Sequence, residues 1–336
     1  MPDKISHIRD WKPARKFPET YPGDCPPGSY LLLGDKVYPL IVDESPGLQL
    51  EKNPGESTAV DEILDEFRLP LLHDRFALLA YGANRNPATL HIKFLNYNYK
   101  CKGDTLAVPM LRGQIIDGDV VACGLSGQGY FYGDLLINSE FTHSTYTEVW
   151  IALLDHDQLR VMHDSEGIRE GDLYKVAQFE GIQVAGIEKT ISPLGYAGQT
   201  PILLSPEYQS PLGFRSIRAT MRQIPEMTAI EMLAHLLDAF DLRRQIVKCT
   251  GLKNDVHLAA ELAKFLNGQW WYHFNTGQPP IRGYREIMRL FKEQITLHSL
   301  QISMSDQLQK RGQILSTEEA YHPDPCFRWP VFIKNQ

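Results

Sequence analysis

The residues best suited to chemistry lie in two short stretches, one around Glu166 and the other from Tyr81 to Asn84. Glu166 stands where a short helix ending near Gly167 gives way to a strand that begins near Leu173. A carboxylate partly walled by apolar strand residues can have its pKa raised, which suits a general acid and base near neutral pH. The pattern indicates a proton-transfer group, and it is equally that of a glutamate in a solvated loop.

The stretch Tyr-Gly-Ala-Asn, residues 81–84, follows the apolar run 76–80 and precedes Pro87. This pattern predicts a buried strand that turns into a helix, since Gly82 permits unusual backbone angles and proline suits a first helical position. Such a turn directs several backbone N–H groups into one concavity, which favours an anion or a carbonyl oxygen. Taken alone, the pattern is also typical of a purely structural turn.

The elements that must position these residues are short apolar strands separated by Gly-rich turns, within a domain of residues 71–210. We expect strands near 75–81, 105–116, 119–125, 130–137, 145–154, 173–180 and 182–191, with helices near 86–95 and 156–164. The fold class is therefore α+β, with a mixed or antiparallel barrel-like sheet and helices at its side. Neither a G-x-G-x-x-G turn nor a phosphate-binding loop motif occurs, so no nucleotide cofactor is expected.

A Pro/Gly-rich arm, residues 1–70, precedes this domain, because prolines interrupt every candidate helix up to about residue 56. Within the arm, two short strands joined at Gly34 and Asp35 predict a small hairpin. Residues 57–68 predict a short amphipathic helix that begins at a Ser or Thr cap. We expect this arm to lie across the main body.

An α-helical C-terminal subdomain and an extended tail, residues 211–336, follow the domain. We expect helices over about 228–248, over 254–266 with a stop at Gly268, and within 281–309. The aromatic segment 268–280 favours docking of the subdomain on the sheet over lining a cleft. The tail from Tyr321 to Pro330 is expected to be extended and bound to the surface.

The length of 336 residues and the composition are those of an ordinary globular chain, with a formal net charge of −7 and a pI near 5.9. This charge argues against nucleic acid as a partner, because phosphate binding needs concentrated Lys and Arg. No apolar run is long enough to cross a bilayer, so no membrane partner is expected and the predicted location is cytoplasmic. The cysteines are odd in number and without C-x-x-C pairs, which predicts neither disulfides nor a zinc cage; they are Cys25, Cys101, Cys123, Cys249 and Cys326.

Together the two stretches resemble the gamma-glutamylcyclotransferase-like family over roughly residues 75–200. Residues 79–84, Leu-Ala-Tyr-Gly-Ala-Asn, are similar to the family's aromatic-Ala-Tyr-Gly-Ser-Asn loop. Residues 162–167, Met-His-Asp-Ser-Glu-Gly, and Gly-Asp-Leu-Tyr at 171–174 are similar to its Leu-Asp-x-x-Glu-Gly and Gly-x-Tyr segments. Between them, residues 147–154 stand where the family has a Val-Trp-Gly strand.

Two positions depart from the family pattern, since Ala83 stands in place of the usual serine and His163 in place of the usual aspartate. The resemblance implies a small mixed barrel and an enzyme of the acyltransferase or lyase type, which releases 5-oxoproline from a γ-glutamyl amine, amide or peptide without metal or organic cofactor. By position, it implies that Glu166 is the catalytic acid and base and that the substrate is bound by Tyr81, Gly82, Ala83, Asn84 and Tyr174.

The chemistry of a γ-glutamyl group suits this assignment, because its own α-amine can attack the γ-carbonyl and close a five-membered ring. The protein must bend the substrate, accept a proton from the ammonium, stabilise the oxyanion and return a proton to the leaving amine. One carboxylate can perform both transfers. Loop amides can hold either the α-carboxylate or the oxyanion. The small-molecule γ-glutamyl compound is then the expected partner, and the oligomeric state stays open.

Four other hypotheses remain at this point. A cyclotransferase-type fold can serve as a non-catalytic binding or scaffolding protein if the arm or segment 268–280 fills the pocket. The same pocket can support hydrolysis or acyl transfer instead of cyclisation. His163, Asp164 and Glu166 can be read as metal ligands, and Cys123 as a thiol nucleophile, although a buried inert cysteine is the better interpretation.

Overall fold

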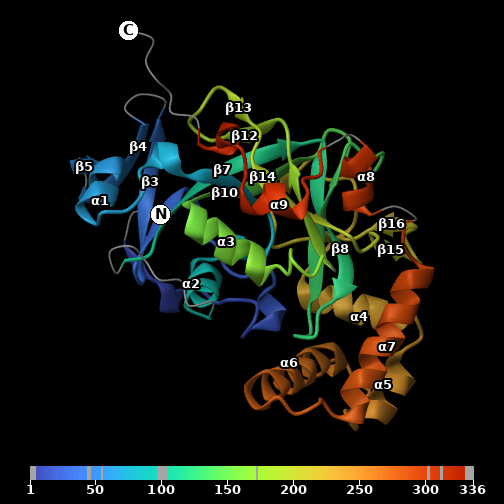
Figure 1. The fold of residues 1–336 in the computed structure, drawn as a ribbon. Helices are drawn as coiled ribbons and strands as arrows, with labels where there is room; N and C mark the ends of the chain where they lie inside the picture. Colours follow the sequence, from blue (N-terminus) through green and yellow to red (C-terminus); the bar gives the residue numbers. More distant parts are fainter. Residues whose placement is uncertain are drawn as a thin grey trace.

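The computed structural model describes most of the chain, which folds around one large mixed sheet (Figure 1). The residues described are 5–43, 47–53, 56–96, 105–171, 173–300, 303–310 and 313–329. The main path of the sheet has the order β11-β14-β6-β10-β7-β2-β3-β4-β5. Its strands are β2 Tyr30–Leu33, β3 Lys36–Asp43, β4 Gly47–Asn53, β5 Glu56–Ala59, β6 Phe76–Ala80, β7 Ala107–Ile116, β10 Tyr146–Leu154, β11 Tyr174–Gln178 and β14 Leu194–Gly198.

A second sheet of order β19-β17-β8-β9 packs against the first. Of the further short strands that the structure describes, four belong to the main sheet and two form a separate two-stranded sheet. The second sheet consists of β8 Gly118–Leu125, β9 Phe131–Ile137, β17 Gly213–Phe214 and β19 Glu226–Met227. The short strands are β1 Ser6–His7, β12 Ile182–Val184, β13 Thr190–Ile191, β15 Leu204–Ser205, β16 Ser210–Pro211 and β18 Ala219–Thr220. Of the predicted α+β fold, the mixed sheet and the C-terminal helices are thus confirmed.

The second sheet packs on one face of the central strands and helices cover the other, which explains why these strands are apolar without alternation. In β10, Val149 and Ile151 face one buried cluster, whereas Trp150 and Ala152 face another. The helices are α1 Val60–Glu66, α2 Pro87–Asn96, α3 His156–Ser165, α4 Ala229–Ala239, α5 Arg243–Thr250, α6 Leu258–Thr276, α7 Arg282–Leu297, α8 Met304–Lys310 and α9 Thr317–Tyr321. Helices α2 and α3 cover the second face, and the candidate site forms at their ends.

The predicted closure of the sheet into a barrel is not seen in the described part of the chain, where the main path ends at β11 and β5. The edge of β7 that lies away from β10 is occupied by two other strands. Tyr30 of β2 pairs with Met110, and Gln183 of β12 pairs with Gln114. Because the N-terminal strands extend the sheet from this edge, it is not available for closure.

The N-terminal hairpin is confirmed, since β2 and β3 pair antiparallel across Gly34 and Asp35. The helix within 57–68 is also present as α1, but its predicted Ser or Thr cap is wrong. The N-cap is Ala59, because residues 56–59 form strand β5 and are used in the sheet. The strand predicted over 182–191 is likewise divided into β12 and β13.

The C-terminal helices differ from prediction in their ends. The single helix predicted over 228–248 is wrong, because Asp241 has a φ of 51° and separates α4 from α5. The predicted stop at Gly268 is also wrong, since α6 continues to Thr276. A glycine inside a helix costs only about 1 kcal/mol relative to alanine, and buried side chains such as Leu266 on the same helix offset this cost.

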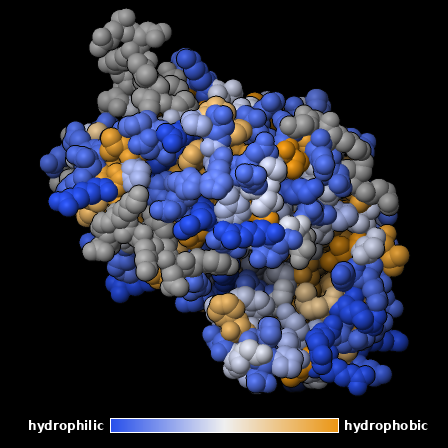
Figure 2. All heavy atoms as spheres, in the orientation of Figure 1, coloured by the Kyte–Doolittle hydropathy of each residue, from blue (hydrophilic) through white to orange (hydrophobic). Residues whose placement is uncertain are grey.

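The aromatic segment of α6 docks the helices on the rest of the molecule. The Tyr284 hydroxyl of α7 donates to the Gly127 carbonyl at the tip of the β8-β9 hairpin (3.2 Å), and Trp270 lies against the same glycine. Trp271 Nε1 donates to the Arg15 carbonyl of the arm (3.1 Å). Figure 2 shows a largely hydrophilic face with hydrophobic residues gathered where the helices meet the sheets. No helix in the described ranges is long and apolar enough to span a membrane.

The C-terminal tail is more deeply placed than predicted. Arg328 forms a β-bridge with Phe76 at the start of β6, and Trp329 N–H donates to the Arg75 carbonyl (2.6 Å). The Trp329 side chain is buried. Pro330, the last residue of the predicted extended tail, lies outside the described residues.

Candidate active site

The end of α3 fixes the position of Glu166. The Ile168 N–H donates to the His163 carbonyl (3.1 Å) and the Gly167 N–H to the Asp164 carbonyl (3.3 Å). Together with a φ of +69° at Gly167, these bonds form the C-terminal cap that requires glycine at its left-handed position. The sequence Glu-Gly therefore acts as a helix stop that holds the Glu166 backbone in place.

The Glu166 carboxylate is held from two sides through a single oxygen. Asn84 Nδ2 donates to Oε1 (2.9 Å), and the Lys93 ammonium of α2 forms an ion pair with the same atom. Over the described ranges, Oε2 has no hydrogen-bond donor. A carboxylate whose one oxygen is anchored while the other is free can accept a proton in a defined direction.

The loop 81–84 lies beside this carboxylate and presents its backbone amides. β6 ends at Ala80, a single turn of 3₁₀-helix follows over Ala83–Arg85, and Pro87 opens α2 as predicted. The N–H groups of Gly82, Ala83 and Asn84 have no acceptor within the described chain. Unpaired amides at a turn favour an anion or a carbonyl oxygen, so the expected concavity is present.

All of the predicted site residues line one cavity of about 120 Å³. Glu166 and the loop 81–84 form one part of its wall, and Tyr174 at the start of β11 forms another. Asp172, which belongs to the quoted 171–174 motif, lies outside the described residues. The cavity is also lined by Arg15, Tyr21, Leu79, Ala80, Thr89, Lys93, Tyr130, Tyr132, Gly133 and Tyr196.

Lys93 is the main residue that sequence reasoning missed. Only 4% of its surface is exposed, and burial lowers its pKa, while the neighbouring Glu166 carboxylate raises it. The available signal was its spacing from Thr89, because residues four apart lie on the same helix face. Both side chains line the cavity, so this helix face carries polar groups into the site.

The N-terminal arm also contributes to the cavity, which sequence patterns did not reveal. Tyr21 is buried, with its ring stacked on Tyr130 at a centroid distance of 4.6 Å, and its hydroxyl accepts from the Gly133 N–H (2.8 Å). A Cβ atom at Gly82 would lie 3.3 Å from this hydroxyl. The close approach explains why glycine suits position 82. Arg15 brings a second cation to the same wall and has no ion-pair partner within the described chain.

Tyr81 anchors the loop through a buried carboxyl group. Its hydroxyl donates to Asp134 Oδ1 (2.9 Å) and to the Tyr196 carbonyl (2.6 Å). Burial raises the pKa of Asp134 to about 7, although hydrogen bonds from Tyr81 and from the Leu135 and Gly198 N–H groups lower it. The Tyr81 side chain thus holds the start of the loop in place.

His163 has a supporting role next to the site. The Ala320 carbonyl can only accept, so Nε2 carries the proton and donates to it (3.0 Å), while Nδ1 accepts from the Tyr196 hydroxyl (3.0 Å). Burial lowers the pKa of His163 to about 4. The imidazole is therefore neutral at pH 7, and with both nitrogens engaged it is not arranged as a metal ligand.

Other reactive groups are less accessible. Among the described residues, no three His, Cys, Asp or Glu side chains gather as metal ligands. Cys123 is buried and burial raises the pKa of its thiol. Ser205 Oγ lies 2.8 Å from His235 Nε2, whose Nδ1 lies 3.5 Å from Glu207, but the serine is fully buried. A substrate cannot reach that hydroxyl. Cys101 lies outside the described residues.

Comparison with known proteins gives structural matches only. No protein-family model matches the sequence, and no curated protein matches it. Two solved structures that match are an uncharacterized protein from Homo sapiens and a gamma-glutamyl cyclotransferase. Each is 14% identical, with a TM-score of 0.26, and the match covers 64% of this chain and 99% and 98% of theirs, respectively.

Proposed function

We propose that this chain is a cofactor-independent cyclotransferase-like enzyme that releases 5-oxoproline from a γ-glutamyl amine, amide or peptide. The observation that carries the proposal is the arrangement of Glu166, whose Oε1 is held by Asn84 and Lys93 beside the unpaired amides of the loop 81–84. A proton acceptor and an oxyanion or carboxylate cradle are both needed for this reaction. Glu166, Tyr81, Gly82, Ala83, Asn84 and Tyr174 form the proposed site.

The reaction begins with transfer of a proton from the substrate's α-ammonium to Glu166. The freed amine attacks the γ-carbonyl carbon, so that a C–N bond forms and the carbonyl oxygen gains the electron pair as an oxyanion. The tetrahedral intermediate then collapses: Glu166 gives its proton to the leaving nitrogen, and the bond from the carbonyl carbon to that nitrogen breaks. The ring nitrogen, which still carries two protons after its attack, gives one of them to Glu166, which passes it to the released amine as its ammonium proton. Atoms and charges balance without hydrolysis or an external reductant, and positioning the two ends of the substrate supplies much of the rate.

The cations of the cavity define what the substrate must carry. Lys93 and Arg15 line the same wall as Glu166. They match the α-carboxylate of a glutamyl group, which would otherwise enter a partly apolar cavity at a high desolvation cost. At about 120 Å³ the cavity is smaller than the roughly 300–1,000 Å³ of pockets that enclose drug-sized ligands. It therefore suits the glutamyl head group, with the leaving amine outside.

Tyr21 favours a second candidate function, binding without turnover. Its ring and hydroxyl, supplied by the arm, occupy space beside Gly82 that a longer substrate would need. In this alternative the cavity holds a small γ-glutamyl-like ligand, or 5-oxoproline itself, as a signal. Hydrolysis or acyl transfer in the same cavity is the remaining variant. The four cysteines that the structure describes form no disulfide, which suits a cytoplasmic setting for each of these functions.

The test is incubation of the full chain with a panel of γ-glutamyl amines, amino acids and peptides, followed by mass spectrometry. Release of 5-oxoproline together with the free amine is the expected result. Glutamate in place of 5-oxoproline would indicate hydrolysis, and a new γ-glutamyl conjugate would indicate acyl transfer. Tight binding of panel compounds with no product at all would support the binding protein and contradict the enzyme.

A further inference from the structure

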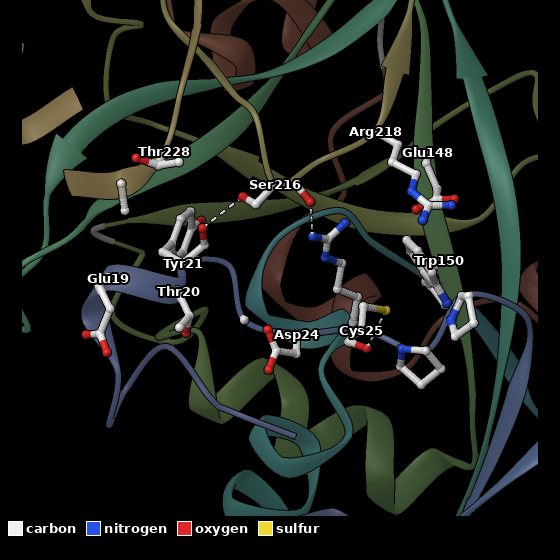
Figure 3. A pocket seen from close by; sticks show the side chains of 15 residues that line it. Glu19, Thr20, Tyr21, Asp24, Cys25, Glu148, Trp150, Ser216, Arg218 and Thr228 are labelled. Atoms are coloured by element: carbon white, nitrogen blue, oxygen red, sulfur yellow. Dashed lines mark hydrogen bonds between the residues drawn. The ribbon is translucent and has the colours of Figure 1, made fainter. Parts of the chain in front are cut away.

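A second and larger cavity, drawn in Figure 3, adjoins the Glu166 cavity, because Tyr21 lines both. Its volume is about 400 Å³. The arm supplies Asp24 and Cys25, β10 supplies Trp150, and the segment after β17 supplies Ser216 and Arg218 (Figure 3). The first turn of α4 completes the wall at Ala229. The proposed reaction does not use this cavity.

The feature that points to a ligand is Arg85, a buried guanidinium that lines this cavity and has no carboxylate partner within the described chain. Only 3% of Arg85 is exposed. Its Nη2 donates to the Ser216 carbonyl (2.8 Å), its Nε has no hydrogen-bond partner in the described residues, and its Cζ lies 5.3 Å from the Trp150 ring centroid. A buried cation normally requires an anion.

The nearby acidic residues do not fill that role. Glu148 is ion-paired with Arg112, whose Nε lies 2.5 Å from Oε2. Asp24 and Glu19 are exposed at the rim, where Arg218 is exposed as well and has no ion pair in the described ranges. The start of α4 adds a favourable partial positive charge. The floor of the cavity therefore favours an anion, and its rim offers groups of both signs.

We propose that this cavity is a second binding site, which takes a small zwitterion with a carboxylate and an ammonium group, such as a free α-amino acid. A planar carboxylate matches the fork of a guanidinium in two parallel hydrogen bonds. The ammonium group then faces the carboxylate of Asp24 or Glu19. A dianionic phosphate fits less well, because these acids would repel its second charge. Trp150 and Pro26 provide apolar surface for a side chain.

This site is independent of the reaction proposed at Glu166, although Arg85 follows Asn84 directly in the chain. The first test uses the wild-type full chain and calorimetry with L-leucine, its amide, 4-methylpentanoate and inorganic phosphate. L-leucine should bind at least about tenfold more tightly than the amide, which lacks the carboxylate, and than 4-methylpentanoate, which lacks the ammonium. Equal binding of all three, tighter binding of phosphate, or no binding of L-leucine would overturn the proposal.

The second test locates the ligand. Arg85→Met keeps an unbranched side chain against Trp150 but removes the charge, so L-leucine binding should be lost. Arg243→Met, at a partly exposed arginine paired with Asp238 and outside both cavities, is the matched control and should bind normally. If Arg85→Met does not fold, Asp24→Asn and Arg218→Gln at the exposed rim decide instead, with an expected loss of about fivefold or more each.

Glu166→Gln separates the two cavities. This variant should bind L-leucine as the wild type does, even if it has lost all turnover. Loss of L-leucine binding in Glu166→Gln, with binding retained in Arg85→Met, would place the ligand in the Glu166 cavity and overturn the second site. If the cyclotransferase proposal fails, no product forms from γ-glutamyl compounds. That outcome does not change the expected binding of L-leucine in the second cavity.

Discussion

Glu166 at the end of α3 and Lys93 on α2 form an ion pair inside the candidate active site, although 73 residues separate them in the sequence. Asn84 shares the carboxylate oxygen with the lysine. The pair joins the two helices that cover one face of the main sheet and leaves the other oxygen of Glu166 free within the described chain. Structure and proposed chemistry therefore depend on the same contact.

Lys93→Met should destabilise the protein by about 1–3 kcal/mol, because it leaves a partly buried carboxylate with Asn84 as its remaining partner. The double variant Lys93→Met/Glu166→Gln should lose less stability than the sum of the losses in the two single variants, since it removes both charges. Urea unfolding of the two single variants and the double variant measures this coupling. Strictly additive losses would mean that the ion pair contributes nothing to stability.

Gly82→Ala should impair the loop because its new Cβ would lie 3.3 Å from the Tyr21 hydroxyl. We expect a loss of about 1 kcal/mol in stability and a higher KM for the substrate. Adding Tyr21→Phe to Gly82→Ala removes the hydroxyl and should lower the KM part of the way back to the wild-type value. Gly268→Ala, in α6 with no neighbour within 4 Å, is the control and should stabilise the helix slightly. An unchanged KM in Gly82→Ala would contradict the assigned contact.

Two buried titratable groups next to the site should give opposite pH dependences. Asp134 has its pKa raised from 3.8 to about 7, so its contribution to stability is present at low pH and is lost as the pH rises through about 7. His163 has its pKa lowered from 6.5 to about 4, so its contribution is present above pH 6.5 and is lost as the pH falls toward 4. Between these limits the two effects oppose each other.

Single variants should reveal each effect by urea unfolding across this pH range. Relative to the wild type, Asp134→Asn should gain stability as the pH rises, by up to roughly 1.4 kcal/mol per pH unit. His163→Gln should lose stability over the same range for the opposite reason. If the free energy of unfolding of both variants changes with pH just as that of the wild type does, the two groups do not titrate as their burial predicts.

Gly129→Ala should loosen the docking of the C-terminal helices. Gly129 has a φ of +87°, and a Cβ there would lie 2.5 Å from the Ala263 carbonyl oxygen of α6. Gly277→Ala is matched in backbone conformation, with a φ of +68° and no neighbour within 4 Å. Gly129→Ala should cost about 1–3 kcal/mol more than this control, measured by thermal unfolding. Equal losses would exclude the contact with α6 as the cause.

Sequence patterns predicted the central strands well because burial on both faces leaves uninterrupted apolar runs such as β6. They also predicted the strand-to-helix turn at 81–84 and the helix stop at Glu166, whereas only the resemblance to the gamma-glutamylcyclotransferase-like family placed the two in one site. Long-range packing escaped them. Tyr21 enters the site from the arm, and no local pattern encodes this contact. The spacing of Thr89 and Lys93 places both on one helix face, but it does not identify Glu166 as the partner of Lys93. The left-handed backbone conformation of Asp241, which divides α4 from α5, is likewise not predicted by any sequence pattern.

The most direct test of the central claim is the rate of 5-oxoproline release by Glu166→Gln, relative to the wild type, on the best γ-glutamyl substrate. Glutamine keeps the size of the side chain but cannot carry the proton, so the account predicts a fall in kcat of about 10²-fold or more, with retained secondary structure and substrate affinity. A Glu166→Gln protein that turns over at close to the wild-type rate would contradict the account.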